Sequence, residues 1–253
     1  MRILYQLTSP MDKTIGPQEV RRREQVLQEY AATGTAVTVE PTTTGPAAIE
    51  SARDAGIVIP ELIRLAPHAQ ERGFDAIIIG CYSDPGIDAL REMLRIAVIG
   101  PGAASLYLAA QLGTRLSVLT PAGRGFGRVA ARLRALALEP LLASVRGIGL
   151  SVMDLAQQRP GALEKATKAA RSAVEQDGAD ILVLGCMSMA FLPGICETMS
   201  DKVGVPVVNP VIAALKTAEM VAGMKLVHSK IAYPVPRPII PGPPRERCTR
   251  VNQ

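Results

Sequence analysis

The sequence is poor in aromatic residues and contains no tryptophan. Phenylalanine, tyrosine and tryptophan together make up 3% of the 253 residues. Proteins that bind single-stranded nucleic acids stack bases on aromatic side chains, and this chain supplies few of them. The net charge of +5 comes from basic residues that are interspersed with acidic ones along predicted helices, as around RRREQ (21–25), which indicates solvated faces. We therefore expect no nucleic-acid partner, and the charge suits a small anionic or polar substrate.

Long apolar runs are also absent. Although 48% of the residues are apolar, the sequence contains no run of 18 apolar residues, which is the length needed to cross a bilayer. The first ten residues, MRILYQLTSP, lack the apolar core and cleavage site of a signal peptide. We expect a cytoplasmic protein with no membrane contact, in which the four cysteines are free thiols and not a disulfide framework.

Motifs for metals and common cofactors are missing as well. The chain has no HExxH and no CxxC, and its two histidines, His68 and His228, are isolated and expected at the surface. The GRGFG segment (123–127) lacks the spacing of a phosphate-binding loop and predicts a turn before a helix at 129–138. No lysine lies in a recognisable pyridoxal-phosphate motif. We expect a mechanism that uses neither a cofactor nor a metal.

What the sequence does contain is a regular alternation of short runs rich in Ile, Val and Leu with longer amphipathic segments. This alternation is typical of an α/β protein, in which helices flank a mostly parallel sheet. The longest predicted helices cover 19–33 and 47–72, the second interrupted by Gly56 and Pro60. The predicted strands cover 2–7, 36–41, 76–81, 96–100, 115–120, 181–186 and 206–210.

An internal repeat divides the chain. GFDAIIIGC (73–81) and GADILVLGC (178–186) match in register, and each precedes a helix-like segment, a strand that ends in proline and an alanine-rich helix. This order predicts two similar, pseudo-symmetric lobes with a site in the cleft between them, beyond the carboxyl ends of the strands. The predicted lobes are residues 1–97 with 210–232, and residues 98–209.

The C-terminal residues 233–253 break this pattern with six prolines between 234 and 244. Such a composition predicts a flexible tail, and the alternative is an extended arm that embraces a neighbouring subunit. Cys248 lies in this segment, and we expect no role for it. Cys196 has no counterpart in the first lobe and is expected to be structural.

The two cysteines that end the repeated segments, Cys81 and Cys186, occupy equivalent points of the lobes. Each follows a buried strand and precedes a predicted helix, for which Asp84 is the expected N-cap and Pro85 the first residue in the first lobe. A helix N-terminus favours the thiolate and lowers the pKa of a thiol. A lone cysteine here is more often a small buried hydrophobic residue, but duplication favours chemistry.

Two sulfurs on opposite sides of a cleft can act as base and acid in a stereoinversion. One thiolate removes a proton from a carbon next to a carbonyl, and the opposite thiol returns a proton to the other face. The negative charge that flows into the carbonyl needs hydrogen-bond donors. Backbone N–H groups could supply these, and so could hydroxyls at strand ends, namely Thr8, Ser9, Ser83, Thr120 and Ser188.

Three segments resemble a known family: GCYSDPGIDALRE (80–92), GADILVLGCMSM (178–189) and GVPVVNP (204–210) are similar to the aspartate/glutamate/hydantoin racemase superfamily, and within it to hydantoin and allantoin racemases. The resemblance covers about residues 1–228. It implies cofactor-independent inversion in an interlobe cleft, commonly in homo-oligomers, with Cys81 and Cys186 as acid and base. The substrate-binding residues expected with it are Thr8, Ser9, Tyr82, Ser83, Thr120, Met187, Ser188, Asn209 and Pro210.

The sequence departs from this branch beside the substrate. An Asn-Pro-Asn-Thr-Ser element is replaced by residues 6–11 (QLTSPM), and an acidic residue near the start of the next helix by PGAAS (101–105). We therefore predict a racemase or epimerase of a hydantoin-like or amino-acid-derived carbon acid. The alternatives are a maleate-type cis–trans isomerase, an arylmalonate-type decarboxylase and a non-catalytic, redox-responsive binding protein.

Overall fold

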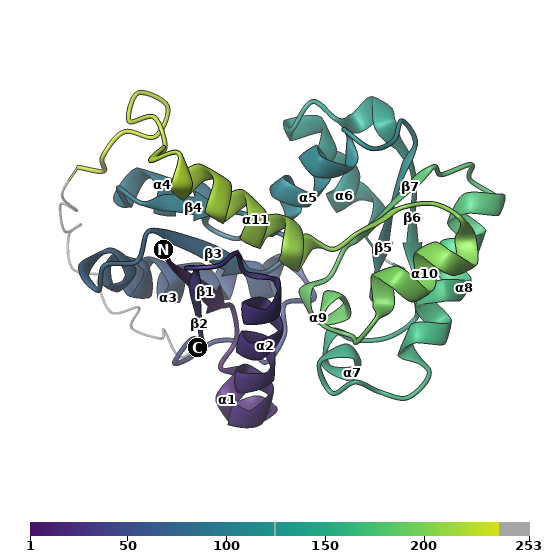
Figure 1. Ribbon diagram of the computed structural model, residues 1–253, viewed down its shortest axis with the longest axis horizontal. Helices are drawn as coiled ribbons and strands as arrows, with labels where there is room; N and C mark the ends of the chain where they lie inside the picture. The colour runs from purple at the N-terminus through teal and green to yellow at the C-terminus, as the bar shows by residue number, and fades with distance from the viewer. Residues whose placement is uncertain (124, 238–253) are drawn as a thin grey trace, which may run out of the picture.

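The structure is a computed structural model that describes residues 1–123 and 125–237, and it has two lobes (Figure 1). Each lobe contains a four-stranded sheet in which all pairings are parallel. The first sheet has the order β2-β1-β3-β4 and the second the order β6-β5-β7-β8. Corresponding strands thus hold corresponding places, which confirms the predicted α/β fold with two pseudo-symmetric lobes.

The strands of the first sheet are β1 (Arg2–Leu7), β2 (Ala36–Glu40), β3 (Ala76–Gly80) and β4 (Ala97–Ile99). Those of the second sheet are β5 (Leu116–Thr120), β6 (Leu142–Gly147), β7 (Ile181–Leu184) and β8 (Val207–Val208). The central strands β3 and β7 are buried along their apolar residues, as expected for parallel strands covered on both faces.

In the first lobe, helices cover both faces of the sheet because successive side chains of a strand point to opposite sides. The helices are α1 (Met11–Thr14), α2 (Pro17–Tyr30), α3 (Ala52–Glu71) and α4 (Ile87–Met93). Leu4 of β1 and Ile77 of β3 pack with Val58 of α3 in one apolar cluster. Tyr5 and Ile78, on the opposite face, belong to the larger cluster that continues into the second lobe.

The second lobe repeats this layering. Its elements are α5 (Pro101–Ala109), α6 (Phe126–Ala135), a 3₁₀ turn (Glu139–Leu141), α7 (Val152–Ala156), α8 (Ala162–Glu175), α9 (Met187–Ala190) and α10 (Ile195–Val203). The last helix, α11 (Pro210–Gly223), packs against β3 and β4 and so returns to the first lobe (Figure 1). The predicted boundary after residue 97 cuts through β4, because this strand pairs with β3 as far as Ile99.

Two local features differ from the predictions. Helix α3 is continuous from Ala52 to Glu71 although it contains Pro60, and it starts at Ser51, whose capping box with Asp54 satisfies two backbone N–H groups. Strand β6 was not predicted. Its side chains are only partly buried, so it shows neither a clean alternation nor an apolar run. Beyond residue 237, the predicted tail and Cys248 lie outside the described residues.

Candidate active site between the lobes

A cleft of about 780 Å³ lies between the two lobes, and both repeated cysteines line it. Nine of the eleven predicted site residues are among its lining: Thr8, Ser9, Cys81, Tyr82, Ser83, Thr120, Cys186, Met187 and Ser188. They come from the carboxyl ends of β1, β3, β5 and β7 and the turns that follow. The parallel topology therefore brings together residues that lie far apart in the sequence, as open α/β sheets do.

Cys81 lies in the turn after β3, where its Sγ is 3.2 Å from the hydroxyl oxygen of Ser83. Burial raises the pKa of the Cys81 thiol above its ordinary value. Hydrogen bonds from Ser83 and Thr8 and the positive charge of Arg132 act in the opposite direction without outweighing burial. The expectation of a lowered pKa is therefore wrong for Cys81, because the loss of water around the sulfur is the larger effect.

Cys186 lies at the N-cap position of the short helix α9 and is 6% exposed. Burial raises the pKa of its thiol to about 11, although hydrogen bonds from the backbone of Met189 and Ser188 favour the thiolate. A negative charge on Cys81 would raise the pKa of Cys186 further. The two sulfurs are thus close enough to influence one another, and ionisation of one opposes ionisation of the other.

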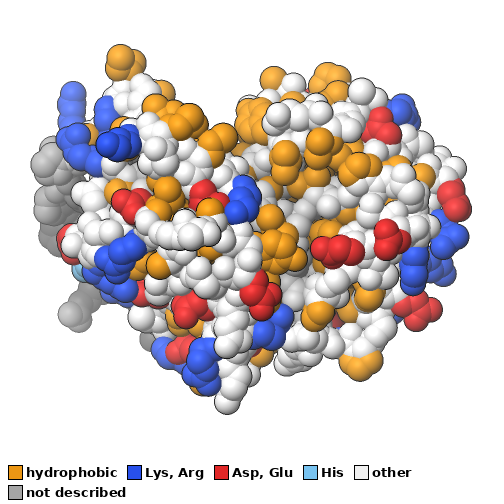
Figure 2. All heavy atoms as spheres, viewed as in Figure 1, with side chains coloured by type: hydrophobic (Ala, Val, Ile, Leu, Met, Phe, Trp, Pro, Cys, Tyr) orange, Lys and Arg blue, Asp and Glu red, His pale blue; other side chains and the backbone are white. Residues whose placement is uncertain are grey.

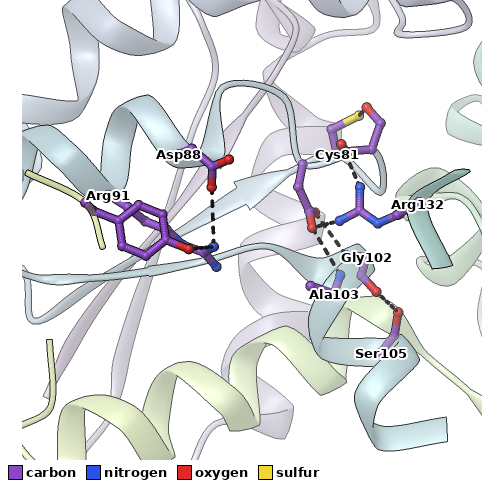
Figure 3. Close-up of polar contacts among 10 residues, drawn as sticks. Cys81, Asp88, Arg91, Gly102, Ala103, Ser105 and Arg132 are labelled. Atoms are coloured by element: carbon purple, nitrogen blue, oxygen red, sulfur yellow. Dashed lines mark hydrogen bonds and ion pairs between the residues drawn. The ribbon is translucent and has the colours of Figure 1, made fainter. Parts of the chain in front are cut away.

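Asp84 does not cap the helix that follows it in the sequence. Its backbone is left-handed (φ 47°), and Gly86 precedes α4 instead. The buried Asp84 carboxylate accepts hydrogen bonds from the backbone N–H groups of Gly102 and Ala103, at 3.0 and 3.1 Å, at the start of α5. It also forms an ion pair with Arg132, which reaches from α6 of the second lobe towards the Cys81 turn (Figure 3).

Asn209 and Pro210 do not line the cleft. The Asn209 side chain caps α11: its Oδ1 accepts from the backbone N–H of Val211 at 2.9 Å, and its Nδ2 donates to the carbonyl of Ala190 at 2.9 Å. These contacts use the polar atoms of the amide within the protein. The structure therefore does not bring these two predicted residues into the cleft lining, and Asn209 joins α9 to α11.

Three arginines that sequence reasoning did not select also line the cleft: Arg23, Arg128 and Arg132. Arg23 belongs to the RRREQ segment that was interpreted as a solvated face, yet it is 2% exposed and pairs with Glu19. A surface interpretation fails here because α2 packs towards the second lobe. In the sequence, only the position of Glu19 four residues before Arg23 could have indicated that the two form a buried ion pair.

A second group of lining residues is mostly apolar. It is built from the first half of α3 with the loop before it, and from α7 with the loop before that helix; its apolar residues include Ala48, Ile49, Ala52, Ala55, Ile59, Leu150, Val152, Met153 and Ala156. The cleft lining thus combines two sulfurs and several hydrogen-bond donors with a set of apolar side chains. Within the described part of the chain, no three His, Cys, Asp or Glu side chains are grouped so that they could hold a metal.

The described helices include none that is long and apolar enough to cross a membrane.

The family model for Asp/Glu/Hydantoin racemase matches residues 18–218. The chain belongs to this family. The matched range contains both cysteine segments, α6 and all of α2 except its first residue, so the resemblance expected from the sequence motifs is confirmed.

Relatives and solved structures agree with this assignment. The chain is 33% identical over 204 residues to the hydantoin racemase of Paenarthrobacter aurescens, which covers 80% of this chain and 85% of the relative. It is 30% identical over 208 residues to the hydantoin racemase of Pseudomonas sp. (strain NS671), with 82% of each chain covered. The crystal structure of allantoin racemase from Pseudomonas fluorescens superposes with a TM-score of 0.84 at 28% identity, over 96% of this chain and 100% of that one.

Proposed function

We propose that this protein is a cofactor-independent racemase or epimerase that inverts a hydantoin-like or amino-acid-derived carbon acid, with Cys81 and Cys186 as the two proton-transfer groups. One observation supports this proposal above the others. The two cysteines come from opposite lobes, follow equivalent strands and line one cleft. The relatives named hydantoin racemase give the substrate class, since they share about a third of their residues with this chain.

The proposed reaction moves one proton in each direction. The thiolate of one cysteine removes the proton from the stereogenic carbon, and the electron pair moves into the adjacent carbonyl as an enolate. The thiol of the other cysteine then delivers its proton to the opposite face, so that the two cysteines exchange protonation states. Return of a proton through solvent resets the enzyme, and the reverse reaction uses the same steps with the roles exchanged.

The raised thiol pKa values have two opposite effects on this chemistry. A thiolate whose thiol has a high pKa is a stronger base towards a weak carbon acid, but a smaller fraction of it is present near neutral pH. Because ionisation of Cys81 raises the pKa of Cys186, the site disfavours two thiolates and retains one thiol as the acid. Donors for the enolate oxygen are available among the polar groups of the cleft, including the side chains of Thr8, Ser9 and Thr120.

The test is proton exchange in D₂O, followed by ¹H NMR together with optical rotation. Wild type should replace the hydrogen on the stereogenic carbon of a 5-substituted hydantoin by deuterium while it loses optical rotation. Cys81→Ser and Cys186→Ser should each abolish racemisation. Cys196→Ser is the matched control, because Cys196 lies on α10 and outside the cleft lining, so this variant should retain activity. Racemisation at the wild-type rate by either cleft variant would disprove the two-base proposal.

The same samples separate the alternatives. Cis–trans isomerisation of maleate or loss of carboxylate from an arylmalonate, without racemisation, would assign one of the related activities. Intact mass with and without reductant would reveal a Cys81–Cys186 disulfide, which would favour a redox-responsive protein. Since the mechanism needs a free thiol on each side, we place the enzyme in the reducing cytoplasm.

We also propose that the protein forms a homo-oligomer through an exposed apolar surface on α5 and α11. The two helices pack side by side, and the apolar residues on and after them are roughly half exposed: Tyr107, Leu108, Leu112, Met220, Met224, Leu226 and Val227. Figure 2 shows hydrophobic side chains over this side of both lobes. Light scattering should give a multiple of 26.8 kDa, and Met220→Glu with Met224→Glu should reduce it; a wild-type monomer would overturn the proposal.

A further inference from the structure

The two arginines beside the cysteine turns, Arg132 and Arg23, cross between the lobes in opposite directions. Arg132 lies on α6 of the second lobe and contacts the turn after Cys81 in the first lobe. Arg23 lies on α2 of the first lobe and contacts the segment after Cys186 in the second lobe. Helices α2 and α6 each follow the first strand of their lobe, so the arrangement obeys the pseudo-symmetry of the fold.

The contacts are also equivalent in position. Nη1 of Arg132 donates to the carbonyl oxygen of Ser83 at 2.8 Å, two residues after Cys81. Nη2 of Arg23 donates to the hydroxyl oxygen of Ser188 at 3.1 Å, two residues after Cys186. Both arginines line the cleft, and their charges favour the thiolate of the cysteine in the other lobe: Arg132 that of Cys81 and Arg23 that of Cys186.

We propose that Arg132 and Arg23 are reciprocal positioning residues: each reaches from its own lobe to fix the cysteine turn of the other and to place a positive charge beside the sulfur there. This inference rests on the proposed acid and base roles of Cys81 and Cys186. It adds that each proposed proton-transfer cysteine depends on an arginine from the opposite lobe. Racemisation would then require the lobes to be joined in the arrangement in which both arginines make their contacts.

Each arginine is fixed by a carboxylate. Arg132 pairs with Asp84, and Arg23 donates from Nε to Glu19 at 2.8 Å. Substitution of either arginine leaves its carboxylate with other partners, because Asp84 keeps two backbone N–H groups and Glu19 keeps Arg22, whose Nε lies 2.7 Å away. Arg132→Gln and Arg23→Gln should therefore fold, and the conservative variants Arg132→Lys and Arg23→Lys give a second measurement at each position.

The test measures the reactivity of each cysteine separately and needs no substrate. Protein is treated with iodoacetamide at pH 8, and mass spectrometry of peptides gives the alkylation rate of each thiol. Because only the thiolate reacts, Arg132→Gln should slow alkylation of Cys81 by about tenfold and leave Cys186 nearly unchanged. Arg23→Gln should do the reverse. Lysine at either position should recover most of the rate, because it restores the positive charge.

A purely structural role would give a different pattern. A loosened cleft would expose both sulfurs and speed alkylation of both, and unchanged rates would mean that the arginines do not act on the cysteines; either result overturns the proposal. Arg146→Gln is the matched control, since Arg146 pairs with Asp177 at 2.6 Å on the second lobe and does not line the cleft. If the arginine variants show the crossed alkylation pattern but wild type does not racemise the substrate, the effect of each arginine on the opposite cysteine stands and the proposed function fails.

Discussion

Gly80 and Gly185 occupy equivalent positions, each directly before a proposed acid or base cysteine and each against the neighbouring central strand. A Cβ atom on Gly80 would lie 2.9 Å from the main-chain oxygen of Gln6, and one on Gly185 would lie 2.8 Å from that of Leu119. Main-chain atoms inside a sheet cannot move aside as the end of a side chain can. The glycine of each repeated Gly-Cys pair is therefore required by the close approach of β1 to β3 and of β5 to β7.

Alanine at either glycine should destabilise the fold and displace the cysteine that follows. We expect Gly80→Ala and Gly185→Ala each to lower the free energy of unfolding by about 1–3 kcal/mol, as overpacking of a rigid interior does. Urea denaturation measures this loss. Gly223→Ala in α11 is the control: its Cβ would meet only the Met1 side chain at 3.7 Å, so stability should be unchanged or slightly higher. Equal stabilities of all three variants would contradict this account.

Much of the fold could be predicted because its signals are local or repeated. The buried strands β3 and β7 are continuous apolar runs, and the repeated Gly-Cys endings indicated two equivalent lobes. Parallel strands bring their carboxyl ends to one edge, which is why nine predicted site residues met in the cleft. The missed strand β6 is half-exposed, and its sequence LASVRG contains no pattern that separates it from a loop.

The parts of the site that were missed depend on contacts between lobes. Arg23 looks like any basic residue of a solvated helix until the second lobe covers it. Asp84 precedes a proline, as an N-cap would, but its carboxylate accepts a hydrogen bond from the backbone N–H of Gly102 in the helix that starts at Pro101. The pKa of Cys186 is decided by burial and not by its place before a helix. None of these effects is encoded within a few neighbouring residues.

The ion pair between Asp84 and Arg132 should be worth more than a surface ion pair, because the carboxylate is 3% exposed. Asparagine tolerates the left-handed backbone of Asp84, so Asp84→Asn removes the charge with little change in shape. We expect it to lower the free energy of unfolding by about 3 kcal/mol, since the half-buried guanidinium loses its partner. Urea denaturation of Asp177→Asn provides the comparison.

Asp177 forms a more exposed pair with Arg146, and its removal should cost no more than about 1 kcal/mol. Losses of the same size in both variants would show that the interlobe pair stabilises the protein no more than the exposed pair does. Loss of racemisation in Asp84→Asn alone, at urea concentrations where both variants are folded, would further link this pair to the Cys81 turn.

His228 should make the protein less stable in acid. Its Nε2 accepts a hydrogen bond from the backbone N–H of Val98 at 2.9 Å, and burial together with the charges of Arg91 and Lys230 lowers its pKa to about 4. Between pH 6.5 and 4 the unfolded chain binds a proton that the folded chain does not, so the free energy of unfolding falls as the pH falls. Urea denaturation at pH 7 and pH 5 measures this fall.

His228→Gln is the matched variant, because the glutamine oxygen can accept from Val98 but cannot ionise. It should lose less stability than wild type between pH 7 and pH 5. His68→Gln is a second control: His68 is exposed beside Glu71, so its replacement should leave the pH dependence of wild type intact. An acid-side fall that is identical in wild type and His228→Gln would refute the assignment.

Racemisation should accelerate with pH, because the active form contains one thiolate and both thiols have raised pKa values. The pKa of Cys81 lies above its ordinary value of 9.0 and that of Cys186 is about 11, so below pH 8.5 most enzyme molecules contain two thiols. The fraction with one thiolate then rises about tenfold for each pH unit, and kcat/KM should follow it from pH 6.5 to 8.5 after subtraction of the uncatalysed rate. Cys196→Ser should reproduce this slope, since Cys196 lies outside the cleft lining. A profile that is flat over this range would show that the thiolate is already formed near neutral pH, and that burial does not control the proton-transfer groups.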